Sequence, residues 1–126
     1  MKLEHLMSIN QLKETHGGMQ ECVVSYCNLR GITAIHIANE GKRSLRTGMK
    51  LKREGMRKGV PDLYIPHGNG KYIGLWIEFK AGRDRLSIEQ KWWIDKLTEL
   101  GHFACESRSS SDAIQIIDNY FSQGSF

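Results

Sequence analysis

Asp62, Glu78 and Lys80 are charged residues that stand in apolar surroundings. Asp62 begins the apolar run 62–66 (DLYIP), and Glu78 and Lys80 interrupt the run 72–81 (YIGLWIEFKA). In an extended chain, residues two apart point to the same face, so Glu78 and Lys80 are neighbours with Cα atoms about 6.6 Å apart. If the two runs pair as strands, Asp62 adds a second carboxylate at the same point. Such groups are costly in apolar surroundings unless they have a partner or a chemical task.

Two carboxylates and a lysine are the groups required for metal-assisted hydrolysis of a phosphodiester. Carboxylate oxygens bind hard divalent cations such as Mg²⁺, which keep positions open for water and phosphate. A lysine can orient the attacking water or stabilise the charge that develops on phosphate. Glu78 and Lys80 alone are more often an ordinary ion pair on a strand. The Pro-Asp pair sixteen residues ahead makes the pattern more specific, but by itself it still fits both interpretations.

The elements that would position these residues alternate between strands and helices, which indicates an α/β fold. We expect a buried strand over 32–39, because this run is β-branched and almost wholly apolar. Ser87 and Gln90 form a capping-box pattern at the start of a helix, and Gly17 and Gly18 are expected to interrupt the N-terminal helical region. The other expected strands span 62–66, 72–81 and 102–107, and the expected helices span 1–16, 19–30, 87–100 and 112–121.

Positive charge is concentrated in one segment of the chain. The 126 residues carry a net charge of +4, but segment 42–58 alone has eight basic residues and one acid. This segment therefore carries +7 and the remainder −3. Its apolar residues Leu45 and Met49 share one face of an amphipathic helix, and most basic residues point elsewhere. Such a charge run is either a solvated helix face or a surface that binds phosphates through counterion release.

Composition and length exclude several classes of protein. With 40% hydrophobic and 25% charged residues and two prolines, the chain is typical of a single globular domain. It has no apolar run long enough to span a bilayer, and its charged N-terminus does not resemble a secretory signal. Three cysteines without a CxxC spacing argue against a structural zinc site and for a reducing cytoplasm. We therefore expect no membrane partner and no organic cofactor.

The motifs around Asp62 and Glu78 resemble the VRR-NUC family of the PD-(D/E)xK nuclease superfamily. They are GVPDLYIP (59–66), IEFK (77–80) and RLSIEQ (85–90), in this order, and the segment before them (37–63) resembles compact stand-alone phage and bacterial members. The resemblance covers roughly residues 16–121. It implies one nuclease domain over 1–126, in which residues 1–15 are an N-terminal extension.

The resemblance also implies a fold and a set of site residues. The fold would be a restriction-endonuclease-like α/β core, a central mixed sheet of about four strands flanked by helices. Asp62 and Glu78 would bind Mg²⁺ or Mn²⁺, together with the main-chain carbonyl of Phe79, and Lys80 would be the catalytic lysine. Gln90 would project toward the active site, and its place on the apolar face of its helix supports this. Alternatively, Gln90 only completes the helix cap.

One departure from the family pattern concerns the metal. The family has a glutamate on its first helix about four residues before a glutamine, and counting back from Gln20 places His16 there. A neutral histidine nitrogen can bind a metal, although hard Mg²⁺ prefers oxygen. His16 is therefore either a ligand at the edge of the site that favours Mn²⁺ or an ordinary histidine near a helix end.

By the same resemblance, the partners would be branched or duplex DNA and a second copy of the chain. Exposed Ile88 and Trp92 would be a contact surface, or merely isolated exposed side chains. We expect a structure-selective endonuclease of Holliday-junction-resolving type, in the cytoplasm of a bacterium or a phage-infected cell. The alternatives are a nicking or flap-type nuclease of broader specificity and a catalytically silent DNA-binding module. The expected DNA-binding residues are Asn39, Lys42, Arg43, Arg46, Lys50, Arg53, Lys58, Arg83 and Arg85.

Overall fold

The computed structural model describes residues 14–38, 45–55 and 57–122. Within them, four strands form one sheet in the order β1-β2-β3-β4. The strands β1 and β2 and the strands β2 and β3 pair antiparallel, whereas β3 and β4 pair parallel, so the sheet is mixed as predicted. The strands are β1 (Ile35–His36), β2 (Leu63–Ile65), β3 (Leu75–Phe79) and β4 (Phe103–Ser107), and the helices are α2 (His16–Arg30), α3 (Leu45–Arg53), α4 (Ile88–Glu99) and α5 (Ser110–Ser122).

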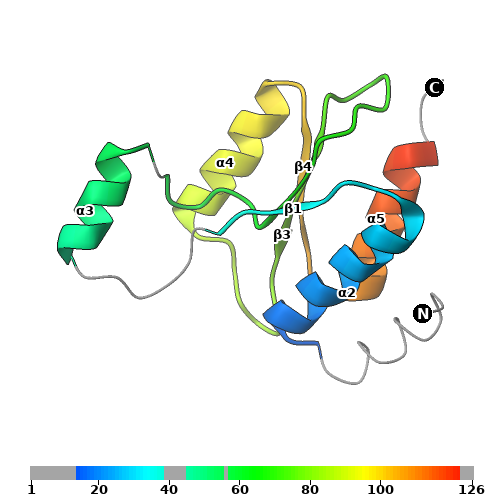
Figure 1. Ribbon diagram of the computed structural model, residues 1–126, viewed down its shortest axis with the longest axis horizontal. Coiled ribbons are helices and arrows are strands. Elements are labelled where there is room, and N and C mark those ends of the chain that lie inside the picture. The colour runs from blue at the N-terminus through cyan, green and yellow to red at the C-terminus, as the bar shows by residue number, and fades with distance from the viewer. Residues whose placement is uncertain (1–13, 39–44, 56, 123–126) are drawn as a thin grey trace.

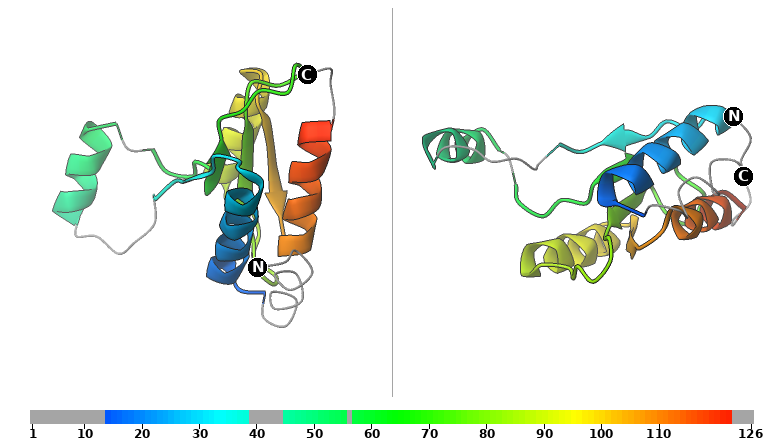
Figure 2. Two further views of the ribbon diagram at one scale, coloured as in Figure 1. Left: turned by 45° about the vertical axis from the view of Figure 1, so that its right-hand side comes forward. Right: turned by 90° about the horizontal axis from the view of Figure 1, so that it is seen from below.

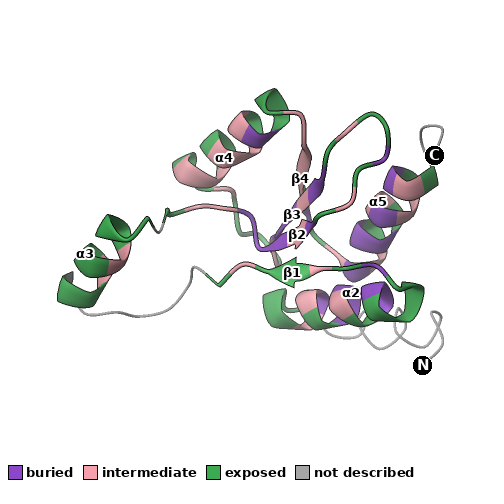
Figure 3. Cartoon of the chain, turned by 45° about the horizontal axis from the view of Figure 1, so that its top comes forward, coloured by how far each residue is buried: buried purple, intermediate pink, exposed green. Residues whose placement is uncertain are grey.

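The main core lies between the sheet and the helices α2 and α5, which pack against each other (Figure 1). Alternation along β3 directs Leu75, Ile77 and Phe79 into this core, where all three side chains are fully buried. Met19 and Ile117 meet them there from α2 and α5. The helix α4 packs against β4 instead, and Figure 3 shows how its burial is confined to one side. The opposite face of β3 is therefore turned toward α4.

The helix α2 begins earlier than the sequence predicted. Gly17 and Gly18 do not interrupt it: α2 starts at His16, and Thr15 is its N-cap. The Thr15 hydroxyl oxygen accepts a hydrogen bond from the amide of Gly18 at 3.0 Å, which satisfies a donor that the first turn would leave unpaired. Because glycine costs little in a first turn that a cap already holds, the pair is tolerated there. Gly31 ends the helix in the left-handed conformation, as predicted.

The expected buried strand over 32–39 is largely wrong. Only Ile35–His36 forms a strand, and both residues are exposed. This strand lies at the edge of the sheet and pairs with β2 alone, so its outer side has no neighbour among the described elements. An apolar run can therefore reflect an edge strand as well as a central one. Asn39, the last residue of the predicted strand, lies outside the described residues.

The basic segment forms α3, which stands away from the rest of the molecule (Figures 1 and 2). The described helix covers Leu45–Arg53 of this segment, and its side chains are exposed or half-buried where described. Met49, on the apolar side of the expected amphipathic helix, remains 52% exposed. Gly55 follows the helix with a positive φ of 102°, as expected of a helix breaker.

The C-terminal half follows the predicted order of elements. Ser87 caps α4, and its reciprocal capping box with Gln90 is present. The helix α5 begins two residues earlier than predicted, at Ser110, because the Ser109 hydroxyl accepts a hydrogen bond from the amide of Asp112 at 3.0 Å. None of the described helices combines the length and apolarity needed to cross a membrane.

His102, at the start of β4, makes the stability of the fold depend on pH. Burial lowers its pKa below the usual 6.5, and its Nδ1 accepts a hydrogen bond from the indole N–H of Trp76 at 3.1 Å. The imidazole of His102 therefore takes up a proton more readily in the unfolded chain than in the folded one. The stability that neutral His102 contributes is complete above about pH 6.5 and is lost as the pH falls below this value.

We therefore expect His102→Asn, which keeps an acceptor but cannot titrate, to flatten the acid side of the stability curve. Denaturant unfolding from about pH 8 to about pH 5 measures this for both proteins. Parallel curves for the wild type and the variant would contradict it.

Candidate active site

Asp62 and Glu78 lie opposite each other on neighbouring strands. The register of β2 and β3 pairs Leu63 with Ile77, and continuing it by one residue places Asp62 opposite Glu78. Only 3% of Asp62 and 2% of Glu78 is exposed. Two carboxylates so deeply buried require donors or cations around them. The predicted juxtaposition is therefore present in the structure.

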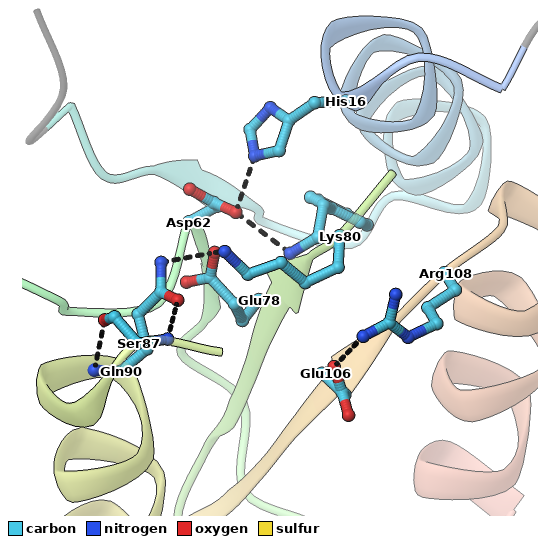
Figure 4. Close-up of polar contacts among 9 residues, drawn as sticks. His16, Asp62, Glu78, Lys80, Ser87, Gln90, Glu106 and Arg108 are labelled. Carbon is cyan, nitrogen blue, oxygen red and sulfur yellow. Dashed lines mark hydrogen bonds and ion pairs between the residues drawn. The ribbon is translucent and has the colours of Figure 1, made fainter. Parts of the chain in front are cut away.

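Donors from two elements hold the Asp62 carboxylate (Figure 4). Its Oδ2 accepts a hydrogen bond from the main-chain N–H of Phe79 at 2.9 Å and lies 3.0 Å from Nε2 of His16. His16 reaches it from the first residue of α2, so the position at which the family has a glutamate does face the site. Phe79 meets Asp62 through its amide, and the predicted role of its carbonyl stays a prediction.

Glu78 is held by Lys80 and Gln90. The Lys80 ammonium is 3.9 Å from Oε2 of Glu78, and the Gln90 side-chain N–H donates to the same oxygen at 3.2 Å. Gln90 also accepts a hydrogen bond from the main-chain N–H of Ser87 at 2.8 Å through Oε1. Gln90 therefore does more than complete the cap, because its oxygen caps the helix while its nitrogen faces Glu78, and its role in the site stays a prediction.

Three side chains in this site could hold a cation. His16, Asp62 and Glu78 each offer a ligand atom, and these atoms all lie within 4.8 Å of one another. The donor set is two carboxylate oxygens and one imidazole nitrogen, which fits Mn²⁺ and similar ions and is less suited to Mg²⁺. Two buried carboxylates beside a single lysine also leave negative charge that a divalent cation would offset.

The site opens into a cavity of about 490 Å³. Besides the predicted residues, Gln20, His36 and Asp84 line it. The side-chain N–H of Gln20 donates to Nδ1 of His36, so α2 and β1 are joined at the cavity wall. Sequence analysis assigned no chemistry to these residues. The spacing of Gln20, one helical turn after His16, was the signal that could have found it.

The expected DNA-binding residues that the structure describes fall into three groups. Arg46, Lys50 and Arg53 are exposed on α3, none of whose described residues lines the cavity and which stands away from the sheet (Figure 1). Arg83 and Arg85 are exposed on either side of Asp84, which lines the cavity. Exposed Lys58 follows α3 and lies 3.7 Å from Glu89 of α4. Asn39, Lys42 and Arg43 lie outside the described residues.

The buried carboxylates lie where the two central strands, β2 and β3, pair in a mixed sheet flanked by helices. The model of the VRR-NUC domain matches residues 9–110. The chain therefore belongs to the VRR-NUC family, and a nuclease-type domain of this kind suggests a divalent metal and DNA as partners. A solved structure described as a VRR_NUC domain protein has a TM-score of 0.76 and 27% sequence identity, covering 89% of this chain and 92% of that chain. No curated protein matches the chain.

Proposed function

We propose that the chain is a metal-dependent DNA endonuclease whose active site is the cavity around Asp62 and Glu78. The observation that carries this proposal is the buried carboxylate pair, within reach of both His16 and Lys80, in a domain of the VRR-NUC family. The whole chain would act as one nuclease domain, with residues 1–15 as an extension. It would work in the cytoplasm of a bacterial or phage-infected cell.

Each residue of the site has a distinct role in this proposal. Asp62, Glu78, the Phe79 carbonyl and His16 would hold the cation. When bound, that cation would make water more acidic and offset negative charge on the scissile phosphate. The Lys80 ammonium is close enough to the carboxylates to orient the attacking water and to stabilise charge developing on phosphate. Gln90 would keep Glu78 in position through its side-chain N–H.

His16 would set the preference of the site for a cation. An imidazole nitrogen in place of a carboxylate oxygen favours Mn²⁺ over the harder Mg²⁺. We expect His16→Glu to lower the ratio of Mn²⁺ affinity to Mg²⁺ affinity by about tenfold, the scale on which single changes around a metal alter its affinity. Calorimetric titration with each ion measures this directly.

The matched control is His36→Gln, which removes a second histidine of the same cavity outside the three-donor set. It should leave the affinity ratio unchanged. If His16→Glu and the wild type have equal ratios, or if His16→Ala cleaves DNA with the same metal dependence as the wild type, His16 is not a ligand.

The substrate would be branched DNA, cut by a homodimer as in a Holliday-junction resolvase. A twofold dimer presents two active sites, which suits symmetric incision of two strands. Arg83 and Arg85 would contact phosphates beside the cavity, and α3 would hold phosphates further away. Asn39, Lys42 and Arg43 would extend this contact by resemblance to the family.

The test is incubation of the purified protein with labelled four-way junction, flap and linear duplex, each with Mn²⁺, Mg²⁺ or EDTA. Paired symmetric cuts in the junction alone would support a resolvase. Cuts in flap or linear duplex at similar rates would favour the nicking or flap-type alternative. Binding without any metal-dependent cut would leave only the silent DNA-binding module.

A further inference from the structure

The outer side of α4 presents two large apolar side chains to solvent. Ile88 is 83% exposed and Trp92 is 48% exposed. They stand one helical turn apart, on the side of the helix that faces away from the active site. Gln90, between them in sequence, points the other way and contacts Glu78. This surface is therefore separated from the proposed active site by about the width of a helix, roughly 10 Å.

Arg57 stacks on this surface. Its guanidinium carbon lies 5.7 Å from the ring centroid of Trp92 and 5.3 Å from that of Trp93. The two indole rings are perpendicular, with centroids 5.1 Å apart. A guanidinium near an indole ring at these distances is a cation–π contact. Arg57 and Trp92 are both exposed, so a positive charge and an aromatic ring stand side by side on this surface.

Contacts made by the two residues that follow Arg57 hold it in this place. The indole N–H of Trp93 donates to the carbonyl of Lys58 at 3.0 Å. Gly59 then passes so close to α4 that a Cβ atom there would lie 2.7 Å from the carbonyl carbon of Glu89, and its φ of 90° also favours glycine. Lys58 and Gly59 are thus held against the first turns of α4. Because Arg57 directly precedes them, its backbone is held close to Trp92.

We propose that Trp92 and Arg57 form a stacking platform for an unpaired nucleobase of DNA bound at the active site. The inference rests on the proposed nuclease function. Bases present aromatic faces that stack on indole regardless of sequence, and such stacking strengthens binding of single strands. Lys58 and Lys91 flank the platform and are exposed, so phosphates on either side of the base meet positive charge. A strand in the cavity needs only a few nucleotides to reach this surface.

The same surface is less suited to a second copy of the chain. Beyond Trp92 the outer side of α4 carries the exposed acidic residues Asp95 and Glu99. The apolar area at Ile88 and Trp92 is therefore small, whereas each partner in a stable dimer buries about 800 Å². At the platform itself Arg57 and Lys91 are exposed and positively charged, and Lys58 beside them is paired with Glu89 at 3.7 Å. The end of the surface at Trp92 therefore favours an anionic partner. DNA with an unpaired base offers both an aromatic face, which can stack on Trp92, and phosphates, which the basic side chains attract.

The platform is tested with a DNA duplex that carries a short single-stranded flap containing 2-aminopurine, in EDTA so that no cleavage occurs. We expect the wild type to quench the fluorescence of this base, because it stacks on Trp92. Trp92→Ala should lose the quenching and bind the flap about 5- to 100-fold more weakly, relative to its binding of fully paired duplex. Trp92→Phe should retain most of both effects, and Arg57→Gln should lose part of each.

Leu100→Ala, which removes another exposed apolar side chain from the far end of α4, is the matched control and should behave as the wild type. If Trp92→Ala weakens binding of flap and duplex DNA equally, or weakens neither, the stacking proposal is wrong. Either result leaves the nuclease proposal unaffected. If sedimentation shows that the wild type is a dimer and Trp92→Ala a monomer, the surface binds a second copy of the chain, and the stacking proposal is wrong. If the wild type binds no DNA, the nuclease proposal itself fails.

Discussion

Asp62→Asn is expected to lower the rate of DNA cleavage by about 10³-fold or more, since the cation it helps to hold contributes several kcal/mol of transition-state stabilisation. The change preserves the shape of the side chain and keeps an oxygen that can accept the hydrogen bond of the Phe79 amide. It removes only the negative charge that would bind the cation. Single-turnover cleavage of a labelled junction in Mn²⁺ measures the loss.

A measurement of stability separates this chemical effect from damage to the fold. In EDTA the Asp62→Asn protein should melt at or above the temperature of the wild type, because it no longer places a charged Asp62 beside a buried Glu78. Mn²⁺ should then raise the melting temperature of the wild type and not that of the variant. A variant that melts well below the wild type in EDTA would show that lost folding explains the lost cleavage.

Asp84→Asn is the matched control for this prediction. Asp84 lines the same cavity but is exposed and lies outside the three-donor set of His16, Asp62 and Glu78. Its variant should cleave within a few-fold of the wild-type rate. If Asp62→Asn also retains such a rate, or if both variants lose activity equally, the buried carboxylate pair is not the metal site.

Neutralising three basic residues in and after α3 should have the second largest effect. Affinity for DNA falls with salt, and each phosphate contact makes the slope of log K against log salt steeper by about 0.9. Replacing Lys50, Arg53 and Lys58 with glutamine should therefore make this slope less steep by nearly 3. At about 0.1 M salt the same change corresponds to a loss of affinity of about 10² to 10³-fold. Fluorescence anisotropy with labelled DNA over a series of salt concentrations measures both quantities.

The control must change the net charge by the same amount elsewhere. Lys71, Lys96 and Arg108 are suitable because they lie outside α3. Lys71 contacts Tyr72, Lys96 contacts Glu99, and Arg108 contacts Glu106 and the carbonyl of Gly82. Their triple replacement by glutamine should leave the salt slope close to that of the wild type. If both triple variants flatten the slope equally, DNA responds to net charge alone, and α3 is a solvated helix.

The core of the site was predictable because it depends on local periodicity. Alternation within one strand placed Glu78 and Lys80 on one face, and a single antiparallel pairing brought Asp62 opposite Glu78. The capping box at Ser87 and Gln90 is equally local, since it needs only a turn of helix. Such features are encoded within a few residues and do not depend on how distant elements pack.

The features that were missed depend on tertiary packing. The run 32–39 has the composition of a central strand, but only the sheet order shows that it lies at an edge. Similarly, His36 reaches the cavity wall because β1 lies beside α2, where it meets Gln20, and the sequence position of His36 does not reveal this. Gly17 and Gly18 are the exception, because the Thr15 cap that allows them in the first turn of α2 is local and independent of tertiary packing. The position of α3, away from the core, is likewise absent from its amphipathic pattern.

The central claim is that the buried pair Asp62 and Glu78 forms a metal-dependent nuclease centre. Its most direct test is to follow cleavage of an end-labelled four-way junction by the wild-type protein as the metal is removed and restored. We expect cleavage in Mn²⁺ to stop completely in excess EDTA and to resume when Mn²⁺ again exceeds the chelator. Cleavage that continues in EDTA, or no cleavage with any divalent cation, would contradict the claim.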